Sequence, residues 1–199
     1  MAATILGVRH APVENPGNLV YARLPGYHLS DAGHRSAGAL AEELAERPLS
    51  AVYASPLERA QETASTLARP HALPVLTDER LIEWSFWSRW EGIPWMTLRE
   101  RAPETFAKYL IDPGSLHPED PLRAVGEGIL GWAAEAADLH EAGLVLGISH
   151  EAPLAAAWAI GGGRGMQAFP TVQIPHLGAV RLAPDPVEVV DVRDVEAAG

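Results

Sequence analysis

Three apolar, β-prone runs end abruptly in polar or charged residues, although they lie far apart along the chain. They occupy residues 4–10, 52–60 and 144–150. Between them lie longer stretches rich in alanine, leucine and glutamate, and this alternation predicts strands separated by helices. Such an order favours an α/β fold, in which helices cover both faces of a mostly parallel sheet.

The same pattern sets the expected limits of each element. We expect strands at residues 5–8, 51–54, 74–76 and 144–148, followed by late strands at 171–174, 179–182 and 187–192. We expect helices at residues 31–46, 56–68, 97–110, 125–141 and 152–160. Ser30 and Ser55 should cap the first two helices, since a serine hydroxyl accepts a hydrogen bond from the first turn, and Pro56 should take the first helical position.

Residues 81–122 break this regular order, and we call them the cap segment. They contain a proline-rich loop at 113–121 and the tryptophans Trp84, Trp87, Trp90 and Trp95. The segment is interpreted as a small cap inserted over the sheet edge, so that residues 1–199 form a single domain. Packing onto the sheet is the expected use of most of these tryptophans.

Composition and charge exclude several classes of protein. The 199 residues carry a formal net charge of −11, which argues against nucleic-acid and membrane-surface partners. No apolar run is long enough to span a bilayer, and no secretory signal is expected. Cysteine is absent, which excludes disulfides, thiolate catalysis and cysteine-bound metals and fits a cytoplasmic protein.

Four basic side chains stand at the polar ends of the three runs, and we expect them to lie close together in the folded protein. In an open α/β sheet, ligands bind beyond the carboxyl ends of the strands, which would bring Arg9 and His10 close to Arg59 and His150. Arginine binds phosphate oxygens through its planar fork, and a neutral histidine can attack phosphorus. The second histidine could stabilise the charge that develops on the phosphoryl oxygens. We therefore predict a phosphoryl-binding crevice.

A proton donor and two further contacts are also expected there. Glu83 is flanked by Leu, Ile and Trp, and burial among them would raise its carboxyl pKa toward neutrality. Asn15 and Arg23 lie close enough to His10 in sequence to reach a substrate. The remaining histidines lack the i, i+4 spacing of a helical zinc site, so no metal or other cofactor is expected.

These residues resemble the histidine phosphatase superfamily, also called phosphoglycerate mutase-like. The resemblance covers most of the chain up to about residue 160. Its motifs here are Arg9-His10-Ala11, Leu29-Ser30-Asp31-Ala32-Gly33, Ser55-x-x-x-Arg59-Ala60-x-x-Thr63-Ala64, Leu81-Ile82-Glu83 and Ser149-His150. The resemblance implies a three-layer α/β/α sandwich and an activity without metal.

The resemblance also implies a role for each site residue. His10 would accept the phosphoryl group, Arg9, Arg59 and His150 would hold its oxygens, and Glu83 would be the acid and base. Ala11 and Glu151 replace glycines of the family pattern, and the segment after Glu83 lacks a glycine and has one extra residue. Glu151 could share the acid role, and the tryptophans of the reshaped loop could line a pocket for an organic leaving group.

The function expected from the sequence is a phosphomonoester phosphatase that acts on a small phosphorylated metabolite through a phosphohistidine. A phosphomutase is the main alternative, disfavoured by the short chain, and a weakly catalytic phospho-ligand binding protein is a third. The expected partner is a small phosphate ester. The sequence leaves the substrate open, and also the oligomeric state, for which a homodimer is one option.

Overall fold

The protein, described by a computed structural model for residues 3–195, is built on one mixed sheet. The strand order is β3-β2-β4-β1-β5-β6. The strands are β1 (Thr4–Arg9), β2 (Leu49–Ala54), β3 (Val75–Thr77), β4 (Leu144–Ser149), β5 (Ala179–Ala183) and β6 (Glu188–Val190). The first four run parallel, whereas β5 and β6 are added antiparallel at one edge. The predicted mostly parallel sheet is confirmed.

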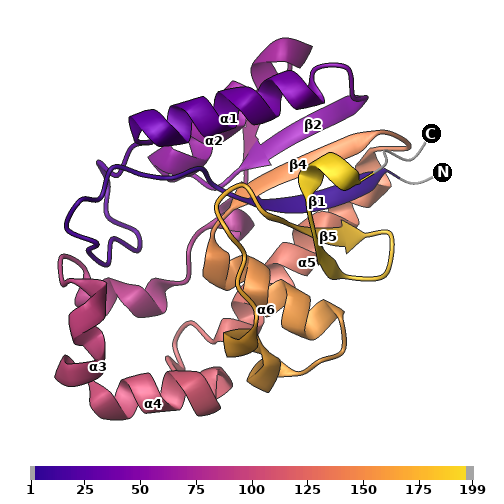
Figure 1. Ribbon diagram of the computed structural model, residues 1–199. Helices are drawn as coiled ribbons and strands as arrows, with labels where there is room; N and C mark the ends of the chain where they lie inside the picture. The colour runs from indigo at the N-terminus through magenta and orange to yellow at the C-terminus, as the bar shows by residue number, and fades with distance from the viewer. Residues whose placement is uncertain (1–2, 196–199) are drawn as a thin grey trace.

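Helices cover both faces of this sheet. They are α1 (Asp31–Leu44), α2 (Glu58–Ala68), α3 (Leu98–Arg101), α4 (Pro103–Ile111), α5 (Leu122–Leu139) and α6 (Glu151–Gly161). Figure 1 shows α1 and α2 on one face and α5 and α6 on the other, while α3 and α4 of the cap segment lie beyond the sheet. Short 3₁₀ turns span Arg69–His71, Glu79–Leu81, Ser85–Trp90, Trp95–Thr97, Pro113–Ser115, Met166–Thr171 and Val192–Asp194. The three-layer α/β/α arrangement is confirmed.

The strands alternate between two cores. Ile5 and Val145 pack with residues of α5 and α6, whereas Leu6 and Leu146 pack with those of α1 and α2, as the two-residue period of a strand requires. On the α5 side, Gly147 lies under the ring of Trp132, and a Cβ there would stand 2.2 Å from the ring. Glycine therefore lets α5 sit directly on β4.

The parallel strands β1, β2 and β4 end together at one edge of the sheet. Arg9, the last residue of β1, is level with Ser149, the last residue of β4, and Ala54 of β2 is level with Ile148. The backbone N–H of His10 donates to the Ser149 carbonyl at 3.0 Å. The three runs identified in the sequence therefore converge, as expected.

Some expected local features are wrong. Helix α2 begins at Glu58, and Ser55 is not its N-cap and Pro56 not its first residue. Residues 171–174 do not form a strand; prolines at 170 and 175 flank them, and proline cannot donate to a strand ladder. The predicted helix at 97–110 is divided at Ala102, because Pro103 starts α4 there. By contrast, Ser30 caps α1, accepting from the Gly33 N–H at 3.0 Å.

Candidate active site

His10 stands at the end of β1 as a buried, neutral imidazole. Its Nδ1 lies 2.8 Å from the Ala11 carbonyl, and since a carbonyl can only accept, Nδ1 holds the proton and Nε2 keeps its lone pair. Burial, reinforced by the Arg59 guanidinium, holds the pKa of His10 well below its usual range. The ring is therefore uncharged at neutral pH, with a lone pair on Nε2.

His150 follows β4 and lies beside His10, with 5.2 Å between the two ring centroids. Its Nε2 is 2.9 Å from the Ser55 hydroxyl, which already accepts from the Leu57 N–H at 3.3 Å. The hydroxyl has one proton to donate, and when it donates to Nε2, His150 carries its own proton on Nδ1. That Nδ1 is buried without a hydrogen-bond partner. The Ser55 hydroxyl thus orients a histidine instead of capping a helix.

Arg59 is a fully buried cation on the first turn of α2. One nitrogen, Nη2, donates to the Ala22 carbonyl at 2.6 Å, and the guanidinium stacks on Tyr21, 4.8 Å from the ring centroid. Its Nε and Nη1 have no hydrogen-bond partner. Burial lowers the pKa of Arg59, but arginine stays charged in proteins. An uncompensated buried charge of this kind favours an anionic ligand.

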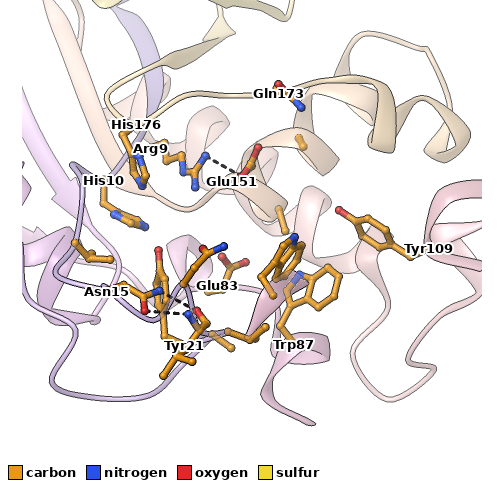
Figure 2. Close-up of a pocket in the computed structure, with 18 of the residues that line it drawn as sticks. Arg9, His10, Asn15, Tyr21, Glu83, Trp87, Tyr109, Glu151, Gln173 and His176 are labelled. Carbon is orange, nitrogen blue, oxygen red and sulfur yellow. Dashed lines mark hydrogen bonds and ion pairs between the residues drawn. The ribbon is translucent and has the colours of Figure 1, made fainter. Parts of the chain in front are cut away.

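Arg9 forms an ion pair with Glu151, the residue that follows His150. Its Nη1 lies 2.8 Å from the Glu151 carboxylate and donates to the Ile174 carbonyl at 2.7 Å. Its Nε is buried without a partner. Glu151 therefore faces the site and pairs with the arginine that a phosphoryl group would also use (Figure 2).

Unpartnered nitrogen atoms are concentrated around His10. Within residues 3–195, eight buried side-chain nitrogens lack a hydrogen-bond partner, and five of them belong to Arg9, Arg59, His150 and His176. Buried polar groups are normally satisfied, so such a cluster needs an explanation. A tetrahedral oxyanion would accept from several of these groups at once.

His176 and Tyr21 are site residues that the sequence analysis missed. The His176 ring centroid lies 5.4 Å from that of His10, and burial lowers the pKa of His176 to about 4. His176 lies in the turn before β5, and Tyr21 in the loop after β1. No motif or spacing marks either residue, since each reaches the site only through the packing of a loop.

Glu83 lies across the cavity from His10 and is suited to hold a proton (Figure 2). Burial raises the pKa of its carboxyl group to about 7, although Arg59 and the Trp84 N–H oppose the rise. The Trp84 N–H donates to this carboxyl at 2.7 Å. The expected shift of Glu83 toward neutrality, and its cause, match the structure.

The two remaining candidates differ in position. Asn15 lines the cavity, but its amide is bonded to the Leu19 backbone through both Nδ2 and Oδ1, at 2.9 and 3.0 Å. Arg23 does not line the cavity; its Nε donates to the Glu83 carbonyl at 2.7 Å, and its Nη2 lies 3.5 Å from Asp120. Arg23 therefore fixes the backbone that presents Glu83.

The cavity in front of His10 has a volume of about 640 Å³. Arg9, Glu151 and His176 lie at the His10 end, and Trp87 and Tyr109 lie at the other (Figure 2). Arg59 and His150 are fully buried and are not among the residues that line the cavity. No group of three His, Asp or Glu side chains in residues 3–195 is placed to hold a metal ion. None of the helices described has the length and apolarity needed to cross a membrane.

Comparison with known sequences identifies relatives. The model of the histidine phosphatase superfamily (branch 1) matches residues 5–191. Phosphoserine phosphatase 1 of Hydrogenobacter thermophilus is 31% identical over 154 residues, which cover 76% of this chain and 72% of that protein. A bifunctional protein of Mycobacterium tuberculosis is 36% identical over 160 residues, and an uncharacterized one is 55% identical over 76 residues. The match to the bifunctional protein covers 75% of this chain and 42% of that protein. The match to the uncharacterized protein covers 38% of each of the two chains.

Solved structures share the fold. Bacillus stearothermophilus YhfR superposes with a TM-score of 0.81 at 23% identity, covering 97% of this chain and 98% of that one. The mycobacterial glucosyl-3-phosphoglycerate phosphatase in complex with VO3 gives 0.76, also at 23% identity, over 90% and 92% of the two chains.

The unpartnered donors predict that inorganic phosphate binds and stabilises the folded protein. At about 100 times its Kd, a ligand specific for the folded state adds about 2.7 kcal/mol of stability, seen as a rise in Tm. Replacing Arg59 by Met should remove most of this rise, because two donors are lost. Arg181→Met is the matched control, since Arg181 also has an unpartnered Nε but lies on β5. An equal rise in the Arg59 variant would contradict this assignment.

Proposed function

The chain belongs to the histidine phosphatase superfamily, and we propose that it is a phosphomonoester phosphatase that forms a phosphohistidine at His10. The observation that carries the proposal is a neutral imidazole, with Nε2 unprotonated, beside a group of buried donors that lack an acceptor. Phosphatases that act on phosphoserine and on glucosyl-3-phosphoglycerate are among its relatives and structural neighbours. A small phosphorylated metabolite is accordingly the proposed substrate.

The reaction has two steps. The lone pair of His10 Nε2 attacks phosphorus, the ester P–O bond breaks, and the leaving oxygen takes the proton of the Glu83 carboxyl group. Glu83, now a carboxylate, removes a proton from water, and the resulting hydroxide attacks the phosphohistidine. The N–P bond breaks, its electron pair returns to Nε2, and inorganic phosphate leaves. Arg9, Arg59 and the Nδ1–H of His150 stabilise the oxygens in both transition states.

Metal independence and a cytoplasmic location belong to the same proposal. In this mechanism arginine and histidine supply the positive charge on the phosphoryl oxygens, so no metal is needed. The cytoplasmic location rests on the cysteine-free sequence, and a homodimer stays an untested prediction. A role in nucleic-acid or membrane binding is disfavoured by the net charge of −11.

Loss of the nucleophile tests the proposed activity. The wild-type protein should release phosphate from an aryl phosphate in the presence of a chelator. His10→Asn should reduce kcat by more than about 10³-fold, the scale for removing a catalytic nucleophile. His34→Asn is the control, since His34 is exposed on α1. Release that persists in His10→Asn would exclude the covalent mechanism, and loss of activity with the chelator would indicate a required metal.

The pKa of Glu83 predicts the alkaline limb of the pH profile. The acid form of Glu83 is present below a pH of about 7 and is lost above it, so kcat/KM for an alkyl phosphate should fall as the pH rises through this value. Glu83→Gln should remove this limb and slow alkyl phosphates more than aryl phosphates, whose leaving groups need no proton. Glu151→Gln should shift the limb to lower pH, because the Glu151 carboxylate raises the pKa of Glu83.

Profiles of kcat/KM from about pH 5 to about pH 9, for the wild type and both variants, provide the measurement. A limb that survives in Glu83→Gln but disappears in Glu151→Gln would assign the acid role to Glu151.

A further inference from the structure

The two ends of the cavity differ in chemistry, and the end far from His10 is aromatic. Trp87 and Tyr109 lie at this end (Figure 2), and the cavity-lining rings of Trp95 and Phe169 are next to them. Their ring centroids are separated by 4.7 Å from Trp87 to Trp95, 4.9 Å from Trp87 to Tyr109 and 5.7 Å from Tyr109 to Phe169. Rings this close are in mutual contact, so they form a continuous aromatic wall.

Two of the four rings are accessible to a ligand, whereas Trp87 and Phe169 are buried. Trp95 keeps 38% of its surface exposed, and Tyr109 is only partly buried. A volume of about 640 Å³ is far more than a phosphoryl group needs and falls within the range of pockets for organic molecules. The apolar surface would gain from being covered by an apolar or aromatic group of a substrate.

Charge gives the second, independent constraint. Of the described residues that line the cavity, Arg9 is the only arginine or lysine, and it lies at the phosphoryl end, paired with Glu151. Glu83 and Glu151 are the acidic groups, while Asn18 and Gln173 are uncharged. A second anionic group on the substrate would therefore find no cation and would meet the Glu151 carboxylate.

We propose that the substrate is a phosphomonoester whose alcohol has an aromatic or extended apolar group and no second anionic group. This inference rests on the proposed phosphatase activity. The wall around Trp95 binds the organic group, and Glu151 rejects substrates with a carboxylate or a second phosphate. Glu151 is thus assigned a role in specificity, which a glycine at that position could not have.

Two matched pairs of substrates separate the two effects. Glycerol 3-phosphate and 3-phosphoglycerate differ only by a carboxylate in place of a hydroxymethyl group, and 2-phenylethyl phosphate and ethyl phosphate differ by a ring. We expect kcat/KM to be at least about tenfold higher for glycerol 3-phosphate and for 2-phenylethyl phosphate within each pair, the scale of a single well-used pocket contact.

Variants assign these preferences to residues. Glu151→Gln should reduce the ratio for the first pair by raising the rate with 3-phosphoglycerate. Trp95→Ala should reduce the ratio for the second pair, chiefly through KM. Trp158→Ala is the matched control for the latter, because Trp158 lies on α6 under Arg164, with 4.4 Å from its ring centroid to the guanidinium carbon, and does not line the cavity. Both ratios should be unaltered in it.

The possible failures can be told apart. Preference for 3-phosphoglycerate over glycerol 3-phosphate, or equal rates within both pairs, would overturn the inference and leave the phosphatase activity standing. Ratios that do not respond to Glu151→Gln and Trp95→Ala would overturn the roles assigned to these residues. Absence of phosphate release from all four esters and from an aryl phosphate would reject the proposed function itself.

Discussion

Burying positive donors without an acceptor is the constraint on which the rest of this site depends. Desolvating a cation is costly unless a partner replaces the lost water, yet Arg59 is fully buried with two nitrogens unpaired. Part of the desolvation cost is offset because the guanidinium stacks on Tyr21 and donates to the Ala22 carbonyl. Burial, together with the same positive charge, lowers the pKa of His10 and keeps it unprotonated. One arrangement therefore accounts for both the proposed anion site and the proposed nucleophile.

The same cavity moves the pKa of a carboxyl group in the direction that acid catalysis needs. Burial lowers the pKa of His10 and raises that of Glu83 to about 7, because loss of water disfavours the charged form of each. Below a pH of about 7 both groups are therefore mainly uncharged, as the proposed nucleophile and proton donor need to be. Arg23 contributes from outside the cavity by holding the Glu83 backbone.

The parallel strands and their convergence could be predicted from the sequence. Three separate apolar runs each end near Arg or His, and in an α/β sheet the carboxyl ends of parallel strands share one edge, where ligands bind. Sequence reasoning failed at Ser55, which lies two residues before the N-cap of α2 and has its hydroxyl 2.9 Å from the His150 Nε2. It also missed His176, which reaches His10 only because β5 is added antiparallel beside β1. Such contacts depend on tertiary packing and leave no periodic pattern in the chain.

The most direct measurement is to trap the enzyme during turnover of an aryl phosphate. Rapid mixing followed by a quench in base preserves a phosphoramidate bond, and peptide mapping by mass spectrometry then locates the phosphoryl group. The account predicts a single phosphoryl group on His10, formed within the first turnover and lost on continued incubation. A phosphoryl group found on His150 or His176 instead would contradict it.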